Sequence, residues 1–366
     1  MRTLVVSDLH LGAHRRTDVL RREGPLAALC DALPDVDRLV ILGDALELRQ
    51  GPMRDVLAIA RPVFERLAGA LGSTGELVLV TGNHDHHLVS PWLADRALHR
   101  PDEPLGLERR LDATEVDAVP ALAALRDAAA ATTFSVAFPG VWLREDVYAM
   151  HGHYLDRLIT LPTFERIATG AMRHVVGPVP EGRGAARAEH FEAALQPIYA
   201  WMHAVAQSPA GAWSSGTQTT SANTWKTLAG RRNGRRSLRD VLMARAFPLA
   251  VGGLNRAQLG PFKADISGEE LRRAGLRAIG EVVWRLGIES EHVVFGHTHR
   301  AGPLPEDDEH EWRVPGTGTR LHNSGSWVDE PIFAAGDHRS PYWGGRAIVV
   351  DDSGPPRLQR LVDDLG

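Results

Sequence analysis

Five short polar clusters lie along the chain, and each combines carboxylate, imidazole or amide side chains. Most follow an apolar run directly, such as Leu4 to Ser7 before the first cluster and Leu77 to Thr81 before the third. Short apolar runs of this kind are typical of buried strands, whose carboxyl ends meet at one rim of a sheet. We therefore expect the clusters to converge. They are Asp8-Leu9-His10, Gly43-Asp44, Gly82-Asn83-His84-Asp85, His151-Gly152-His153 and Gly296-His297-Thr298-His299.

These side chains form a donor set for two divalent cations. Two ions held about 3.5 to 4 Å apart need one ligand that touches both, and the two oxygens of a carboxylate can do this. Asp44 is our candidate for that bridge. A mixed nitrogen and oxygen set without thiolate suits manganese, iron or zinc better than calcium. We expect manganese, with iron and zinc as the alternatives.

The ordered set resembles the calcineurin-like metallophosphoesterase family. The family signature is Asp-x-His, Gly-Asp, Gly-Asn-His-Asp or Glu, a single His, and Gly-His-x-His. The resemblance covers residues 1 to about 155 and about 288 to 352. It implies that Asp8, His10, Asp44 and His299 bind the first metal, and that Asp44, Asn83, His151 and His297 bind the second.

The resemblance leaves His84 free of both metals and implies that it faces the scissile phosphate. There it protonates the leaving oxygen or stabilises the transition state, and Asp85 orients its ring. A carboxylate partner suits a general acid because it raises the pKa of the imidazole and fixes its tautomer. His153, two residues beyond a predicted ligand, either touches substrate phosphate or hydrogen-bonds within its own loop.

The implied reaction is hydrolysis of a phosphodiester or phosphomonoester by attack of a metal-bridging hydroxide. The layout is also similar to that of the UDP-2,3-diacylglucosamine diphosphatases, so a nucleotide-sugar or lipid pyrophosphatase with an acyl-binding cap is one alternative. Those enzymes usually carry Arg in place of His84 and Asp in place of His153. A nuclease would need an open groove, and a non-catalytic scaffold of the same fold would not need the complete set of motif residues.

The spacing of the motifs predicts a core with one long insertion. Residues 1–155 and 287–366 are expected to form the metallophosphoesterase core, with helices at Asp18–Leu33 and Val56–Leu71. The fold class that we expect is α/β, a four-layer sandwich of two mixed β-sheets flanked by α-helices. Residues 156–286 are too long for a loop and are mostly helical in pattern. Because they start after His151 and end before His297, we expect an α-helical cap over the metals.

A run of arginines in this insertion has three possible roles. It is a solvated loop, a clamp on substrate phosphates, or a patch that contacts an anionic membrane surface. The arginines considered for substrate binding are Arg231, Arg232, Arg235 and Arg236.

The composition is that expected of a cytoplasmic enzyme, and the resemblance implies a phosphorylated small molecule or lipid as its substrate. The formal net charge of −5 does not favour stable binding of nucleic acid. The single cysteine, Cys30, cannot form an internal disulfide, which favours a reducing compartment. The first strand begins too early for a cleavable signal peptide, and no apolar stretch reaches the roughly 20 residues of a membrane span.

Overall fold

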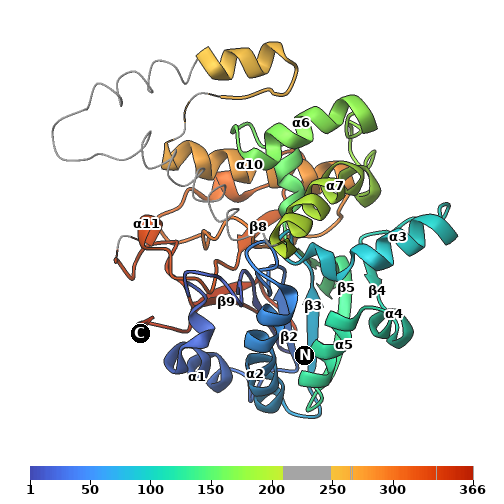
Figure 1. Cartoon of the computed structure of the whole chain (residues 1–366). Coiled ribbons are helices and arrows are strands. Elements are labelled where there is room, and N and C mark those ends of the chain that lie inside the picture. The colour runs from blue at the N-terminus through green and yellow to red at the C-terminus, as the bar shows by residue number, and fades with distance from the viewer. Residues whose placement is uncertain (209–248, 264, 266, 335, 366) are drawn as a thin grey trace.

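The fold is built on one ten-stranded mixed sheet (Figure 1). In the computed structural model, which describes residues 1–208, 249–263, 265, 267–334 and 336–365, the strand order is β10-β9-β1-β2-β3-β5-β6-β7-β8, and β4 pairs with β5. Pairing is parallel from β1 through β2 and β3 to β5, and again from β6 through β7 to β8. The strands are β1 (Thr3–Val6), β2 (Arg38–Leu42), β3 (Glu76–Val80), β4 (Glu108–Arg110), β5 (Thr133–Arg144), β6 (Val147–Met150), β7 (His292–Phe295), β8 (Arg320–Asn323), β9 (Arg346–Val350) and β10 (Arg357–Arg360).

The long strand β5 belongs to both halves of this sheet. Its residues 133–137 pair with β3, and its second part forms an antiparallel hairpin with β6. The strand β6 in turn pairs with β7, which follows the insertion in the sequence. We expected two mixed sheets, and the structure has two halves that stay hydrogen-bonded through one shared strand.

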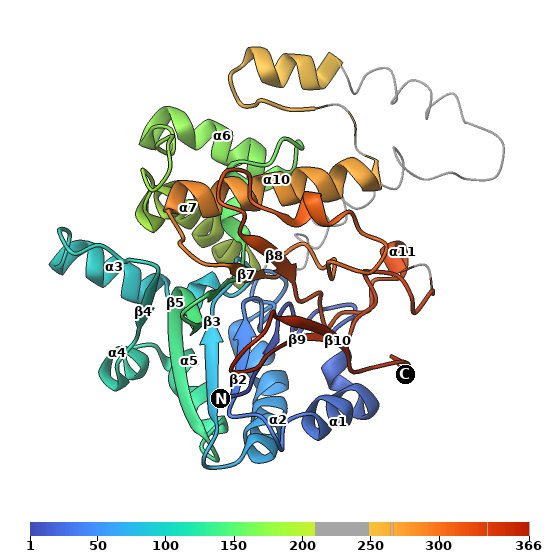
Figure 2. The ribbon, with the colours of Figure 1, turned by 180° about the vertical axis from the view of Figure 1, so that it is seen from behind.

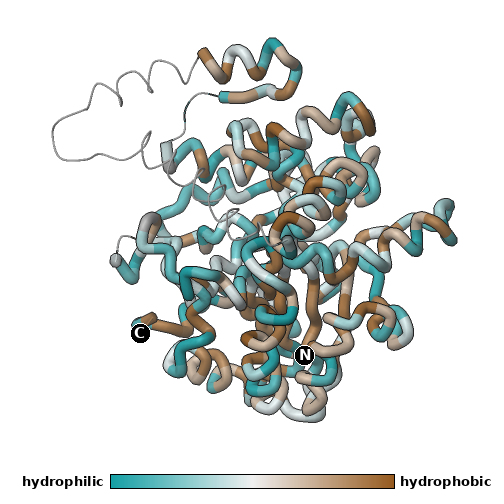
Figure 3. The backbone as a smooth tube through the Cα atoms, viewed as in Figure 1, coloured by the Kyte–Doolittle hydropathy of each residue, from teal (hydrophilic) through white to brown (hydrophobic). Residues whose placement is uncertain are grey.

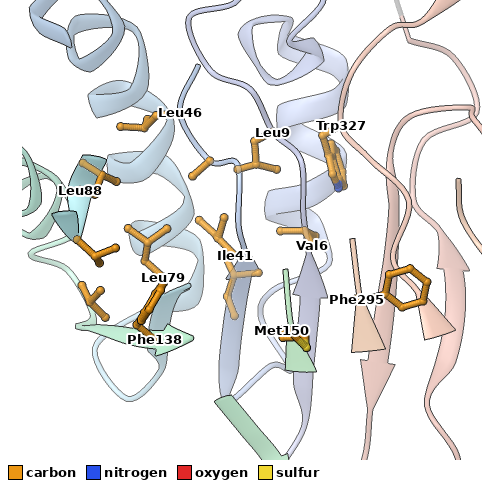
Figure 4. Close-up of a cluster of buried hydrophobic side chains, with 14 of the residues drawn as sticks. Val6, Leu9, Ile41, Leu46, Leu79, Leu88, Phe138, Met150, Phe295 and Trp327 are labelled. Atoms are coloured by element: carbon orange, nitrogen blue, oxygen red, sulfur yellow. The ribbon is translucent and has the colours of Figure 1, made fainter. Parts of the chain in front are cut away.

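Two clusters of buried apolar side chains cover the faces of the sheet. Along β1, Leu4 and Val6 belong to the larger cluster, whereas Val5 belongs to the smaller one. The smaller cluster also contains Val294 of β7, so it joins the two halves of the sheet. Figure 4 shows part of the larger cluster, including Val6 and Ile41. Burial on both faces explains why these strands are continuously apolar in the sequence.

Helices cover the first half of the sheet. Within α2, Val56, Ala60, Val63 and Leu67 recur at helical spacing and are buried, and the helix is followed by Gly72, whose φ is positive at 76°. The helical elements outside the insertion are η1 (Val19–Arg21), α1 (Glu23–Asp31), α2 (Met53–Leu71), η2 (His86–Leu88), α3 (Ser90–His99), α4 (Ala113–Asp117), α5 (Pro120–Ala128), η4 (Glu309–Trp312) and α11 (Pro331–Ala334).

The helix expected over Asp18–Leu33 is divided in the structure. A single 3-10 turn, η1, is followed by α1, and Arg22 between them has extended backbone dihedrals. The carboxylate of Asp18 is buried and accepts a hydrogen bond from the backbone N–H of Gly12, 2.9 Å away. This bond holds the start of the segment against the first motif loop, so one straight helix does not form.

The chain between β6 and β7 is mainly helical where the structure describes it. It begins with η3 (His153–Arg157) and continues through α6 (Phe164–Val176), α7 (Ala188–Gln207), a helical segment at 249–256, and α10 (Gly268–Leu286). Helix α6 packs against α7, and η3 contacts both of them and α10. Opposite views place α6, α7 and α10 on the side of the molecule away from α1 and α2 (Figures 1 and 2).

Hydropathy follows this arrangement, because the central strands are hydrophobic along their length whereas the surrounding helices are mixed (Figure 3). Among the helices that the structure describes, none is long and apolar enough to cross a membrane.

Candidate metal centre

The structure brings the five polar clusters together beyond the carboxyl ends of β1, β2, β3, β6 and β7. Their side chains form three overlapping groups in which all potential ligand atoms lie within 4.8 Å of one another. Asp44 belongs to two of these groups, and His10 to two. The groups are Asp8, His10 and His299; His10, Asp44 and His84; and Asp44, His151 and His297.

One oxygen of Asp44 lies between two sets of ligands. Its Oδ2 is 3.7 Å from Nε2 of His10 on one side and 3.3 Å from Nε2 of His151 on the other. On the first side, Nε2 of His299 lies 3.1 Å from Nε2 of His10 and 3.2 Å from Oδ1 of Asp8. This arrangement fits a bridging role for Asp44.

The backbone is strained at the predicted ligands. Five of them adopt positive φ angles between 46° and 66°, a region that residues other than glycine rarely enter. Each such residue costs on the order of 1 to 3 kcal/mol, and strain of this kind persists at functional sites where the surrounding structure imposes it. The five residues are Asp8, His10, Asp44, His297 and His299.

Glycines in three of the motifs let the loops approach closely. A Cβ atom on Gly43 would lie 2.3 Å from the ring of His151, and one on Gly82 would lie 2.3 Å from Oδ1 of Asp44. A Cβ atom on Gly296 would lie 2.5 Å from Oδ2 of Asp8. These contacts are too short for any side chain, so the motif glycines are needed for packing of the centre.

The side-chain amide of Asn83 lies among three potential ligand atoms. Its Oδ1 lies 3.1 Å from Nε2 of His151, 3.0 Å from Nδ1 of His297 and 3.2 Å from Oδ2 of Asp44, all of which can act as acceptors. The reversed amide would make more hydrogen bonds within the protein, including bonds from Arg49. Hydrogen bonding within the protein thus favours the amide nitrogen at this point, whereas coordination of a cation would require the amide oxygen there. The buried Oδ1 of Asp8 has no hydrogen-bond partner among the described residues.

At this centre the carboxylates and the imidazoles stabilise each other's charged forms. Burial disfavours the charged form of Asp8, yet the neighbouring His299 lowers the pKa of this carboxyl group to about 2. Burial also disfavours the imidazolium of His151, yet the carboxylate of Asp44 raises the pKa of His151 to about 9. A cation bound here would replace such protons.

A second set of acceptors orients the rings of the predicted ligand histidines. The nitrogen of each ring that faces away from the centre lies 2.9 to 3.1 Å from an acceptor, as is usual for metal-binding histidine. Two of these acceptors, Asp156 and Glu330, come from segments that the motif analysis did not include. The pairs are His10 with Glu47, His151 with the carbonyl oxygen of Leu42, His297 with Asp156, and His299 with Glu330.

Glu47, and not Asp85, holds the ring of His84. Both carboxylate oxygens of Glu47 lie 2.9 Å from Nδ1 of His84. The carboxylate of Asp85 instead accepts backbone N–H bonds from Gly82 at 2.7 Å and Ala45 at 2.7 Å, and so ties the second motif loop to the third. The expected role of Asp85 is therefore corrected: all its described bonds are to the backbone. A lone Glu three residues after Asp44, in the apolar run Ala45-Leu46-Glu47-Leu48, was the available signal.

His153 lies behind the predicted ligands and is 1% exposed. Its ring centroid is 5.6 Å from that of His151, and neither of its nitrogens has a hydrogen-bond partner among the described residues. Burial lowers its pKa to about 4. The four arginines Arg231, Arg232, Arg235 and Arg236 lie outside the described residues.

The insertion contributes side chains next to the centre. Arg49, which is 6% exposed, lies with its guanidinium 4.8 Å from the ring centroid of Tyr199 in α7, and its Nη1 is 3.4 Å from Glu165 of α6. Its Nη atoms lie 3.1 and 3.2 Å from the side chain of Asn83. Sequence reasoning missed Arg49 because no motif contains it.

A pocket of about 220 Å³ opens beside His297. Asp156 and Thr298 are among its polar lining residues, and most of its wall is apolar. Its two arginines are ion-paired, Arg272 with Glu311 and Arg300 with Asp307. The apolar lining includes Leu155, Ile159, Leu271, Leu276, Phe295, Trp312 and Tyr342.

Comparison with known families agrees with this site. Residues 1–177 match the family model described as calcineurin-like phosphoesterase, and this part of the chain is a domain of that family. The matched range contains the first four motifs, and the structure places the fifth, Gly296–His299, beside them. The proteins of this family are in general hydrolases. No curated protein matches the chain.

Proposed function

We propose that the chain is a phosphoric ester hydrolase that depends on two divalent metal ions, with manganese as the preferred ion. The position of Asp44 Oδ2 between His10 and His151 carries the proposal. In the proposed assignment, Asp8, His10, Asp44 and His299 hold one ion, and Asp44, Asn83, His151 and His297 hold the other.

Divalent ions at this centre would supply Lewis acidity toward the phosphate oxygens and would lower the pKa of water. The protein supplies the remaining groups. Glu47 binds Nδ1 of His84, which leaves Nε2 to donate a proton to the departing oxygen. The side chain of His84 is 17% exposed and that of Glu47 is 2% exposed. Of the two, only the histidine is accessible to substrate. Arg49, which pairs with Glu165 and stacks on Tyr199, connects the insertion to the loop that carries Asn83.

The pocket beside His297 supports an ester rather than a pyrophosphate substrate. Its apolar wall suits an organic group attached to phosphorus. Arg272 and Arg300 are already paired with Glu311 and Asp307, so neither is left to bind a second phosphate. We infer that residues 156–286 act as a cap that shapes this pocket, since α10 provides part of its wall.

The experiment is a hydrolysis assay with p-nitrophenyl phosphate, bis-p-nitrophenyl phosphate and UDP-sugars, with added manganese. We expect hydrolysis of at least one aryl ester, loss of activity in chelator, and recovery on addition of manganese. Full turnover after metal removal, verified by elemental analysis, would refute the proposal. Hydrolysis of UDP-sugars alone would favour the pyrophosphatase alternative, and stoichiometric metal binding without turnover of any ester would favour a scaffold.

A further inference from the structure

A second pocket, of about 400 Å³, lies in the insertion between α6 and α10. Apolar residues such as Leu158, Val179 and Pro261 form much of its wall. Its charged lining is strongly cationic, because five arginines face only two glutamates, Glu181 and Glu281. The arginines are Arg157, Arg166, Arg173, Arg277 and Arg285.

Two of these arginines are buried and fixed in position. Arg157 is 5% exposed and Arg166 is 6% exposed. Arg157 donates hydrogen bonds to the carbonyl oxygens of Thr169 and of Gly177, the latter at 2.9 Å. Arg166 donates to the carbonyl oxygen of Ile159 at 2.9 Å. These carbonyl groups hold the guanidinium planes, but they carry no charge that could neutralise them.

The positive charge of the pocket is only partly balanced. Arg277 pairs with Glu270 and Arg285 pairs with Glu281. Arg157, Arg166 and Arg173 form no ion pair with any carboxylate of the described residues.

The unbalanced guanidinium groups destabilise one another. Burial lowers the pKa of Arg157 to about 10, and the charges of Arg166 and Arg173 contribute to this shift. Burial and Arg173 also lower the pKa of Arg166. An anion between these groups would offset the free-energy cost of burying their charges. It would also reduce the repulsion between them.

This pocket is separate from the metal centre. Asp156 in η3 faces His297, but the next residue, Arg157, directs its guanidinium toward α6. Helix α10 lies between the two cavities, since Ala274 and Ala278 line this pocket and Leu271 lines the one beside His297. No described residue lines both cavities.

We propose that the arginine pocket is a second anion site that binds the phosphate group of a phosphorylated molecule. Arginine suits this role because its guanidinium donates two parallel hydrogen bonds to phosphate oxygens. The apolar wall accommodates the organic part of the ligand. The phosphate is that of a soluble metabolite or of a lipid headgroup, since both offer the same chemistry. This inference goes beyond the proposed hydrolase activity and does not depend on bound metal.

The test measures binding of inorganic phosphate by calorimetry to the metal-loaded protein and to protein treated with chelator. The metal centre loses its affinity for phosphate when the metals are removed, whereas the arginine pocket should keep one site. Arg173→Ser should weaken that remaining site about tenfold or more, because a charge-assisted hydrogen bond is lost. Arg173 is exposed, so this variant should fold normally. Arg166→Gln, with folding checked by thermal unfolding, should weaken the same site.

Arg183→Ser is the matched control, because Arg183 is an exposed arginine of the same insertion and pairs with Glu289 outside the pocket. It should bind phosphate as the unmodified protein does. Phosphatidylcholine vesicles with and without phosphatidic acid form the second arm. Binding to phosphatidic acid that Arg173→Ser weakens would assign the site to a lipid headgroup. The proposal is overturned if chelator-treated protein binds neither probe, or if Arg173→Ser and Arg166→Gln bind as tightly as Arg183→Ser.

Discussion

Both carboxylate oxygens of Glu47 lie 2.9 Å from Nδ1 of His84, and Oε2 also lies 3.1 Å from Nδ1 of His10. One buried carboxylate thus orients the proposed general acid and a proposed metal ligand. Glu47 can do so because it stands three residues after Asp44, in a loop whose backbone is held by Asp85. The proposed proton transfer and the proposed metal binding would therefore be linked through Glu47, a residue outside the sets that the motifs predict.

Glu47→Gln should lower turnover by about 10- to 100-fold, since outer partners of metal-site histidines typically contribute on this scale. If Glu47 acts through His84, the same change should have a much smaller effect in a His84→Ala background. Steady-state kinetics of the two single variants and the double variant test this coupling. An equal loss in both backgrounds would contradict it and would place the effect of Glu47 at His10.

Substitutions of Asp44 and of His84 should separate an effect on metal binding from an effect on proton transfer. Asp44→Asn removes the proposed bridge and should lower both metal content and activity. His84→Ala should retain both metals and lose turnover on the order of 10² to 10⁴, the usual scale for a general acid. Elemental analysis of each purified variant provides the measurement. Metal loss in His84→Ala would show that His84 is itself a ligand.

Gly82→Ala should damage the centre although it adds only one methyl group. The new Cβ would lie 2.3 Å from Oδ1 of Asp44 and 2.6 Å from its backbone nitrogen, so the second and third motif loops must move apart. We expect reduced metal content with the fold retained. Gly69→Ala is the control, since Gly69 is an exposed residue of α2 with open space around it. That change should be neutral or slightly stabilising, and equal metal contents in the two variants would refute the packing argument.

The sequence predicted the parts of this structure that depend on local pattern. Apolar runs followed by polar residues placed Asp8 and Asp44 at strand ends, and helical spacing indicated α2. Contacts between segments that are far apart in the sequence could not be predicted. Asp156 and Glu330 meet His297 and His299 only after the chain has folded, and each looks like an ordinary surface acid in the sequence. The continuity of the sheet through β5 depends likewise on long-range pairing.

Acid should destabilise the protein through His322, which lies away from the metal centre. His322 is 8% exposed, and its Nε2 lies 3.0 Å from Nδ1 of His292. Burial lowers its pKa to about 3, with further contributions from His292 and Arg320. The unfolded chain binds a proton at this histidine below about pH 6.5, whereas the folded protein does not until about pH 3. The contribution of this residue to the free energy of unfolding is therefore fully present above pH 6.5. It decreases as the pH falls, and at pH 5 it is smaller by about 2 kcal/mol.

His322→Gln removes this titration, so its free energy of unfolding should decrease less between pH 7 and pH 5 than that of the unmodified protein. Denaturant unfolding at several pH values measures the difference. His174→Gln is the control, because His174 is exposed on α6 and its replacement should leave the pH dependence unchanged. If His322→Gln and the unmodified protein lose the same stability over this range, protonation of His322 does not cause the loss of stability in acid.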